Sequence, residues 1–294
     1  RRLGHEVCLR VNLRGFSSIS HETLDGLKHL QVKHDENAFR VTINRPEVHN
    51  AFNEDVIEEL SKTFRLLGNN EALDPENKMR AIILTGNGKS FSAGADLSWM
   101  KKMANYSYGE NKADAERLFD MFDAIKGNRL PVIARVNGAA LGGGSGLVSA
   151  CDFSLAVKKA KFGFTEVKLG LIPAVISSFV LNKIGAGNAA RYFTTGEMFD
   201  GSEAQRIGLV QHVYENEEEM DAGLSKIINQ LSNAGPKAVC SAKSLIARIQ
   251  SISDYSELRD YSTAQIASAR ATDEGKEGVQ AFLDKRKANW CPKE

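Results

Sequence analysis

Three consecutive glycines, Gly142, Gly143 and Gly144, lie between two short apolar stretches of the chain. Glycine carries no side chain, so such a run lets backbone N–H groups approach a ligand atom closely. A helix that begins there adds a positive partial charge behind those groups. A site of this kind suits a developing oxyanion as well as a phosphate. The glycine run is therefore a candidate oxyanion or phosphate site.

One acidic residue, Glu166, follows in an apolar setting made by Phe162, Phe164, Val167 and Leu169. Removal from water favours the neutral form of a carboxyl group, so we expect a raised pKa at Glu166. A carboxyl group with a raised pKa suits proton transfer. The alternative interpretation is an ordinary surface glutamate.

The elements that must position these residues follow one repeated order of strand, small-residue turn and helix, at roughly 50-residue spacing. Such repetition predicts an α/β fold, either a stacked spiral with parallel strand pairs or a doubly wound sheet. The expected strands are 39–43, 80–85, 132–136 and 153–157, and the expected helices are 54–67, 110–126 and 147–150. Asn53 is the expected N-cap of the first of these helices.

Strand patterns stop after about residue 214, and four charged, half-polar helical segments follow. They cover 217–232, 236–250, 254–271 and 274–288. Helices of this composition pack on a neighbour, either their own chain or another subunit. We therefore expect a basic tail at 1–30, an α/β core with the site at 31–214, and a helical oligomerisation region at 215–294.

Composition excludes several classes of function. The 294 residues have a net charge of +1, so neither nucleic acid nor an anionic membrane is the expected partner. No stretch approaches 18 uninterrupted apolar residues, which predicts no membrane span. The four cysteines and six histidines are scattered without metal-ligand spacing. We expect no metal site and a reducing compartment.

Residues 1–20 contain four arginines, one acid at Glu6 and serines towards their end. This composition resembles that of a mitochondrial presequence and predicts a location in the mitochondrial matrix. A basic tail without a targeting role is the alternative, and the bacterial cytoplasm is then the expected location.

Several specific motifs in a fixed order resemble the crotonase family, the enoyl-CoA hydratase/isomerase group, over residues 32–294. They are N-R-P-x-x-x-N-A at 44–51, F-S-A-G-A-D-L at 91–97, P-V-I-A-x-V-N-G-x-A-L-G-G-G at 131–144, C-D at 151–152, F-G-F-T-E-V-K-L-G-L-I-P at 162–173 and F-L-D-K-R-K-A-N-W at 282–290. The resemblance implies a crotonase-like spiral of ββα units with a C-terminal helical trimerisation region. It also implies a homotrimer or a dimer of trimers, an acyl-CoA substrate that brings coenzyme A with it, and no permanently bound cofactor.

The resemblance also assigns roles by position in the matching motifs. The N–H groups of Ala95 and Gly143 would hold the thioester oxyanion, and Glu166 would exchange a proton with a substrate carbon. The residues implied at the coenzyme A moiety are Ala93, Asp96, Leu97, Phe282 and Lys285. Those expected in the acyl pocket are Trp99, Met100 and Val175.

One departure from the family pattern concerns Gly146. Family hydratases carry a second glutamate at this position, two residues after the third glycine, to activate water. Without it, water would be activated by Glu166, by Ser145 or by a carboxylate on the substrate. A Δ3–Δ2 isomerisation, which needs only one base, is the chemical alternative.

The pattern GGGxGL with E-V-K-L-G-L-I-P-A-V-I-S is similar to a branch of methylglutaconyl-type hydratases in leucine or acyclic-terpene degradation. A distal carboxylate on such a substrate would explain the missing glutamate, because like charges repel. We therefore predict a hydratase, with the isomerase as runner-up. A catalytically weak acyl-CoA- or RNA-binding relative is the alternative of another class.

A G-x-G-x-x-A pattern begins at Gly185, but the segment before it has a helical pattern. The dinucleotide fingerprint needs a strand there, so we do not expect nicotinamide binding.

Overall fold

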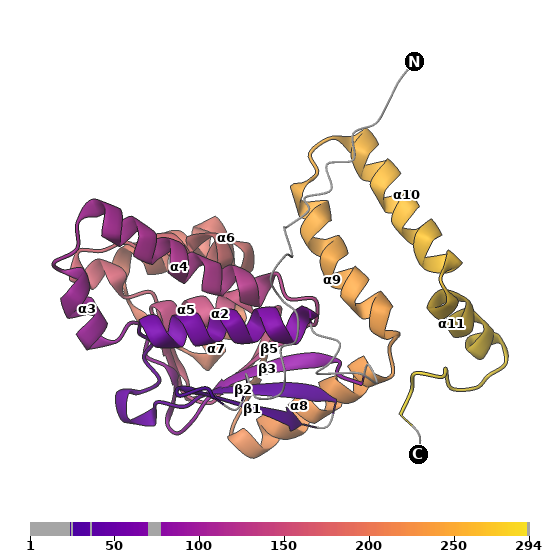
Figure 1. The fold of residues 1–294 in the computed structure, drawn as a ribbon, viewed down its shortest axis with the longest axis horizontal. Helices are drawn as coiled ribbons and strands as arrows, with labels where there is room; N and C mark the ends of the chain where they lie inside the picture. Colours follow the sequence, from indigo (N-terminus) through magenta and orange to yellow (C-terminus); the bar gives the residue numbers. More distant parts are fainter. Residues whose placement is uncertain (1–23, 25, 36, 70–77, 293–294) are drawn as a thin grey trace.

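The computed structural model describes residues 24, 26–35, 37–69 and 78–292 (Figure 1). Segment 1–20, with the predicted presequence, lies outside the described residues. Two β-sheets with helices around them form the body of the molecule, and the last helices form an arm that projects from it (Figure 1).

The larger sheet has six strands in the order β1-β2-β3-β5-β7-β10. All neighbouring pairs are parallel except β1 and β2. The strands are β1 (Leu30–Asp35), β2 (Ala38–Ile43), β3 (Ala81–Gly86), β5 (Val132–Val136), β7 (Phe153–Val157) and β10 (His212–Tyr214). β3 and β5 are buried throughout, as expected of parallel strands that are covered on both faces.

The smaller sheet has the order β4-β6-β8-β9. β4, β6 and β8 are parallel, and β9 pairs antiparallel with β8. Its strands are β4 (Ser90–Ser92), β6 (Ala139–Leu141), β8 (Lys161–Gly163) and β9 (Met198–Asp200).

The chain alternates between the two sheets. β3 is followed by β4, β5 by β6, and β7 by β8, so that each of these three strands of the larger sheet leads into a strand of the smaller sheet. A helix follows each pair. This repeated ββα order confirms the predicted spiral, and the doubly wound sheet that the sequence left open is not formed.

Helices cover the sheets and connect the strands. They are η1 (Pro46–Val48), α2 (Glu54–Asn69), α3 (Leu97–Met103), α4 (Tyr108–Lys126), α5 (Gly143–Ala150), η3 (Glu166–Leu169), α6 (Ala174–Thr195), α7 (Gly201–Arg206) and α8 (Glu217–Ser232). Asn53 caps α2 as predicted, because its Oδ1 accepts a 3.1 Å hydrogen bond from the Val56 N–H. Gly185 lies inside α6, so the dinucleotide-like pattern has no strand before it. No helix among the described residues is long and apolar enough to cross a membrane.

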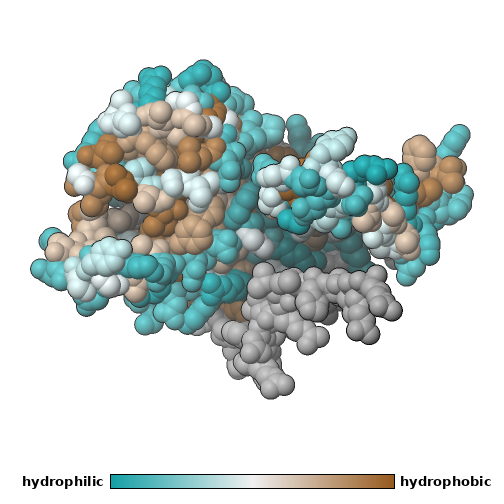
Figure 2. Space-filling model, turned by 90° about the horizontal axis from the view of Figure 1, so that it is seen from above, coloured by the Kyte–Doolittle hydropathy of each residue, from teal (hydrophilic) through white to brown (hydrophobic). Residues whose placement is uncertain are grey.

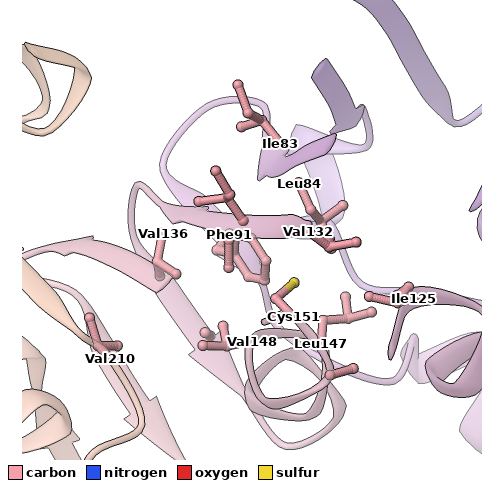
Figure 3. Close-up of a cluster of buried hydrophobic side chains, with 14 of the residues drawn as sticks. Ile83, Leu84, Phe91, Ile125, Val132, Val136, Leu147, Val148, Cys151 and Val210 are labelled. Atoms are coloured by element: carbon pink, nitrogen blue, oxygen red, sulfur yellow. The ribbon is translucent and has the colours of Figure 1, made fainter. Parts of the chain in front are cut away.

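The core lies where the strands of both sheets meet α5. Figure 3 shows apolar side chains from β3, β4, β5 and α5 gathered there. Those labelled in the figure include Ile83, Leu84, Phe91, Val132, Val136, Leu147, Val148 and Cys151. Burial raises the pKa of the Cys151 thiol to about 12, so Cys151 acts as a small apolar side chain.

The arm consists of α9 (Pro236–Ser251), α10 (Tyr255–Ala271) and α11 (Asp273–Leu283). Figure 1 shows it on the opposite side of the body from α3, and Figure 2 shows hydrophobic residues on the surface at its outer end. Lys243 of α9 fastens its base to the body: Nζ lies 2.7 Å from Asp152 Oδ2 and donates a 2.9 Å hydrogen bond to the Leu130 carbonyl. The Asp152 carboxylate also accepts from the Val132 N–H, which ties the arm to the start of β5.

The structure contains strands that were not predicted, among them β1 and the short strands of the smaller sheet, and it shortens one predicted helix. Strand β1 was not predicted, because its alternating burial is interrupted by Lys33 and His34 and its pairing with β2 depends on tertiary contacts. The last helix was predicted to reach residue 288 and ends at Leu283. The chain turns there because Lys285 has a φ of 53° and the Arg286 N–H donates back to the Ala281 carbonyl.

Candidate active site

Three turns that follow the parallel strands β4, β6 and β8 carry Ala95, Gly143 and Glu166. The carboxyl ends of parallel strands lie at the same edge of a sheet, so these turns meet. A Cβ built on Gly94 would stand 3.3 Å from the Gly143 nitrogen, and one built on Gly142 would stand 3.3 Å from Glu166 Oε1. The structure thus brings together the predicted oxyanion donors and the predicted acid.

The turns depend on two glycines with positive φ. Gly94 has a φ of 85° and Gly142 a φ of 50°, a region that L side chains rarely adopt. A Cβ on Gly94 would also lie 2.6 Å from the Leu141 carbonyl oxygen. Both positions therefore require glycine for the two turns to approach each other.

The N–H groups of Ala95 and Gly143 are available to a ligand. The Phe52 N–H donates to the Gly94 carbonyl, and the Phe52 carbonyl accepts from the Asp96 N–H. Ala95 lies between these two hydrogen bonds, so its own N–H is not used in this pairing. Gly143 is the first residue of α5, where an N–H has no partner within the helix. Neither N–H donates a hydrogen bond to another described residue. Two free donors at a helix start can hold a developing oxyanion.

Glu166 is the first residue of η3 and is half-buried. Its Oε2 is buried and has no hydrogen-bond partner among the described residues. Burial raises the pKa of Glu166 above the ordinary value, and its own backbone N–H offsets part of this rise. A desolvated carboxyl group with an unoccupied oxygen is suited to take and return a proton.

An aromatic wall borders the oxyanion donors. The ring of Phe52 stands against Gly143, where a Cβ would lie only 2.3 Å from Phe52 Cζ. Trp99 of α3 packs on Phe52 with the ring centroids 6.3 Å apart. Trp99 was predicted in the acyl pocket, and it is buried next to this wall.

Two apolar side chains fill the space at Gly146, the position of the missing glutamate. A Cβ on Gly146 would lie 2.4 Å from Ile176 Cγ2 and 3.1 Å from Phe122 Cζ. Ile176 belongs to the first turn of α6 and Phe122 to α4. A carboxylate cannot stand here without displacing Ile176, so the second acid is replaced by apolar packing.

Ser145 is not positioned to activate water, and this alternative was wrong. Its side chain is fully buried, and its Oγ donates to the Ala140 carbonyl at 2.7 Å. The same Oγ lies 3.2 Å from the Gly163 carbonyl oxygen and 3.4 Å from the Gly163 N–H. The hydroxyl group thus joins β6 to β8 inside the small sheet.

The predicted coenzyme A residues near α3 differ in their availability. The N–H of Ala93 donates to the His49 carbonyl, whereas Leu97 is 76% exposed and free to contact a ligand. The prediction for Asp96 needs correction. Its buried carboxylate caps α3 through the Ser98 N–H and pairs with Arg45 at 2.9 Å, so it holds the Ala95 turn in place. The Ser98 hydroxyl and Arg45 lower the pKa of Asp96, which keeps it ionised.

The predicted acyl-pocket residues lie on two helices. Met100 is half-buried on α3 beside Trp99, and Val175 is half-buried in the first turn of α6 beside Ile176. Ile176 belongs to the segment 174–178, whose residues are bulkier than the glycine-rich run that the resemblance implies and are therefore also expected at the acyl pocket. Phe52 was not predicted at the site, although it directly follows the N-R-P-x-x-x-N-A motif.

Phe282 and Lys285 are not brought to this site within one chain. Phe282 is 82% exposed at the end of α11, and Figure 1 places α11 on the far side of the molecule from α3. The arm that carries both residues projects away from the body. No group of three or more potential metal ligands occurs among the described residues.

Comparisons with known proteins agree with this geometry. Residues 33–293 match the family model described as enoyl-CoA hydratase/isomerase. A crotonyl-CoA hydratase from Syntrophomonas wolfei is 35% identical over 85% of this chain and 93% of its own length. A peroxisomal Δ(3,5)-Δ(2,4)-dienoyl-CoA isomerase from Arabidopsis thaliana is 30% identical over 92% of this chain and 99% of its own.

A crystal structure of an enoyl-CoA hydratase from Shewanella pealeana superposes with a TM-score of 0.85 at 33% identity, covering 93% of this chain and all (100%) of the other. The fold and its ββα spiral agree with this likeness. The chain is an enzyme of the enoyl-CoA hydratase/isomerase family.

Proposed function

We propose that this protein hydrates a 2-enoyl-CoA whose acyl group carries a distal carboxylate, of the methylglutaconyl type. The observation that carries the proposal is the apolar filling at Gly146. Ile176 and Phe122 occupy the place of a second carboxylate, so Glu166 is the acid that remains beside the oxyanion donors. The site is therefore arranged for chemistry with one carboxyl group of the protein.

In the proposed reaction the thioester oxygen accepts hydrogen bonds from the Ala95 and Gly143 N–H groups. Water adds to C3 while Glu166 takes its proton, and the electron pair of the C2=C3 bond moves towards the thioester to form an enolate. Glu166 then returns the proton to C2, and the carbonyl group re-forms. One donor of an oxyanion hole is typically worth about 3–4 kcal/mol in the transition state.

A carboxylated substrate is compatible with the apolar filling at Gly146. Two carboxylates of the protein together with one of the substrate would repel one another in a desolvated pocket. Replacement of one protein carboxylate by Ile176 removes that repulsion. The similarity of the GGGxGL and E-V-K-L-G-L-I-P-A-V-I-S segments to methylglutaconyl-type hydratases supports the same substrate class, as in leucine degradation.

The test follows the absorbance of the conjugated thioester with purified protein. We expect the band to decrease with methylglutaconyl-CoA and to decrease far more slowly with 3-methylcrotonyl-CoA, which lacks the carboxylate. The Glu166→Gln variant is the matched control and should abolish the decrease. Equal rates with the two substrates would contradict the proposed substrate class.

A second candidate is Δ3–Δ2-enoyl-CoA isomerisation, favoured by the single carboxyl group. Glu166 alone could move a proton from C2 to C4 without a water molecule. A 3-enoyl-CoA then gains the conjugated band when the enzyme is added. Growth of that band, with no loss of the methylglutaconyl-CoA band, would replace hydration by isomerisation as the function.

We also propose a homotrimer or a dimer of trimers. None of the residues described in α9 or α10 is buried in one chain. Apolar side chains on the arm, such as Ile246, Tyr255 and Phe282, are 62%, 80% and 82% exposed. An arm with so little buried apolar surface needs a neighbouring subunit to pack against. Native mass spectrometry measures the number of subunits, and a monomer would contradict this proposal.

For the location we propose the mitochondrial matrix, on the composition of residues 1–20. Residues 1–30 fused to a fluorescent protein should direct it into mitochondria. A fusion that stays in the cytosol would contradict the proposed targeting role.

A further inference from the structure

The indole N–H of Trp99 is a buried donor without an acceptor in the described part of the chain. Trp99 is 2% exposed, and its Nε1 has no hydrogen-bond partner there. Buried tryptophan N–H groups usually find an acceptor, because an unmade hydrogen bond in a dry environment is costly. Even the half-buried Trp290 has an acceptor, since its Nε1 donates to the Asn233 carbonyl at 3.3 Å. The acceptor for Trp99 must therefore come from outside these residues.

The position of Trp99 points to a ligand. Its ring packs on Phe52, and the Phe52 ring stands against Gly143, one of the two oxyanion donors. The helix that carries Trp99 begins two residues after Ala95, the other donor. Trp99 is thus separated from the thioester-binding N–H groups by a single aromatic ring. The ring centroids of Trp99 and Phe52 are 6.3 Å apart, so Trp99 lies in the same part of the site as the oxyanion donors.

Glu166 approaches the same backbone at a different residue. Its Oε1 faces Gly142, whereas Trp99 is reached through the ring against Gly143. An oxygen held by Trp99 therefore need not lie beside the Glu166 carboxylate. This matters for a negatively charged acyl group, since two adjacent carboxylates repel each other.

We propose that the Trp99 Nε1–H group determines specificity by donating a hydrogen bond to the distal carboxylate of the acyl group. This inference rests on the proposed function and names the residue that recognises the distal carboxylate of the substrate. A carboxylate is a strong acceptor for a buried N–H donor. An uncharged hydrocarbon chain leaves the donor unpaired, and a site built around a buried donor rejects a ligand that lacks the acceptor.

The test compares Trp99→Phe with Trp290→Phe. Both changes replace an indole by a phenyl ring, but only the first removes the unpaired donor. We measure kcat/KM for methylglutaconyl-CoA and for 3-methylcrotonyl-CoA. Trp99→Phe should reduce the preference for the carboxylated substrate about 10- to 100-fold, mainly through the charged substrate, as expected for one hydrogen bond to a charged group. Trp290→Phe should leave the preference unchanged.

The outcomes separate this inference from the proposed function. If the wild type prefers the carboxylated substrate and Trp99→Phe keeps that preference, or slows both substrates equally, the role of Trp99 is wrong and the proposed function stands. If the wild type hydrates neither substrate, the proposed function itself fails.

A binding measurement covers the case in which Trp99→Phe does not fold. Trp290→Phe leaves Trp99 as the one tryptophan of the chain. Its fluorescence should shift when the carboxylated 3-hydroxyacyl-CoA product is added and should respond less to the uncharged product. An identical response to both products would overturn the inference.

Discussion

Ile176 occupies the space that a side chain at Gly146 would need, with its Cγ2 2.4 Å from the position of a Cβ there. The two residues are 30 positions apart in the sequence, so only the folded chain brings them together. The resemblance to the family leads us to expect a glutamate at position 146, and the isoleucine fills the room that this glutamate would need. Glu166 therefore remains the acidic side chain predicted to act beside the oxyanion donors.

The packing at Gly146 predicts that Gly146→Ala destabilises the protein by about 1–3 kcal/mol, because the added methyl group overpacks Ile176 and Phe122. Gly187→Ala, within α6, is the control, since nothing lies within 4 Å of a Cβ there. That change should be neutral or slightly stabilising, because alanine favours a helix over glycine. Urea unfolding measures both. Equal changes in the free energy of unfolding for the two substitutions would contradict the predicted overpacking at Gly146.

The same pair predicts how a second acid could be restored. Gly146→Glu alone should lower stability and activity, whereas Gly146→Glu combined with Ile176→Gly should recover stability. In that double variant we expect faster hydration of an uncharged enoyl-CoA, since a second carboxylate can activate water. The single and double variants are compared by kcat/KM and by melting temperature. A double variant no more stable than Gly146→Glu would show that Ile176 is not the obstacle.

Removal of the carboxyl group at Glu166 should abolish catalysis but not binding. Proton transfer by one side chain contributes about 10²- to 10⁴-fold to a rate, so we expect at least this loss of kcat in Glu166→Gln. Because burial raises the pKa of Glu166, the acidic limb of the kcat profile should lie above the pH at which an ordinary glutamate ionises. Full hydratase activity in Glu166→Gln would show that Glu166 is not the catalytic acid. If wild type and variant bound acyl-CoA equally well and neither turned it over, the chain would instead be an acyl-CoA- or RNA-binding protein.

Glu166 also predicts a pH dependence of stability. Its pKa is raised in the folded state, so the unfolded carboxyl group ionises first as the pH rises. Wild-type stability relative to Glu166→Gln should therefore fall from the ordinary glutamate pKa up to the raised one. Below the ordinary value, where the carboxyl group is neutral in both states, this difference should be most favourable to the wild type and independent of pH. Chemical unfolding from pH 4 to pH 8 tests this, and a constant difference would contradict it.

The close approach of Phe52 to Gly143 predicts that Gly143→Ala reduces kcat about 10²- to 10³-fold, the loss expected when one oxyanion donor is displaced. A methyl group there would lie 2.3 Å from Phe52 Cζ, so the loop or the ring must move. Phe52→Leu in the same protein should restore part of the rate by making room. If the second change adds to the loss, the ring is not the cause.

The base of the arm depends on Lys243. Lys243→Ala removes the ammonium group that pairs with Asp152 and donates to the Leu130 carbonyl. Because both acceptors lie in a largely buried place, the free energy of unfolding should fall by about 1–3 kcal/mol. Arg248→Ala removes a pair with Glu257 on the exposed part of the arm and should cost little. Limited proteolysis and melting temperature compare the two. Equal sensitivity would show that Lys243 does not anchor α9.

Much of the fold could be predicted from local patterns. Strands β5 and β7 have the predicted bounds, because mostly apolar runs between turn residues identify buried parallel strands. The repeated strand, turn and helix order predicted the spiral, although a doubly wound sheet has the same order. The short strands of the smaller sheet were not predicted, nor were β1 and the end of α11, since these depend on pairing between distant segments or on a turn at Lys285.

The sequence alone determined the chemistry that this protein can offer: flexible glycines before a helix, one acid among apolar residues and a glycine at the place of the second acid. The first two features follow from residue type and spacing, and the third is implied by the resemblance to the family. Only the tertiary structure decided that Ile176 fills the place at Gly146, that Asp96 and Ser145 are held by neighbouring groups, and that the Trp99 N–H lacks an acceptor. Such facts depend on which side chains from distant segments share one volume, and close packing settles this only when the chain is folded.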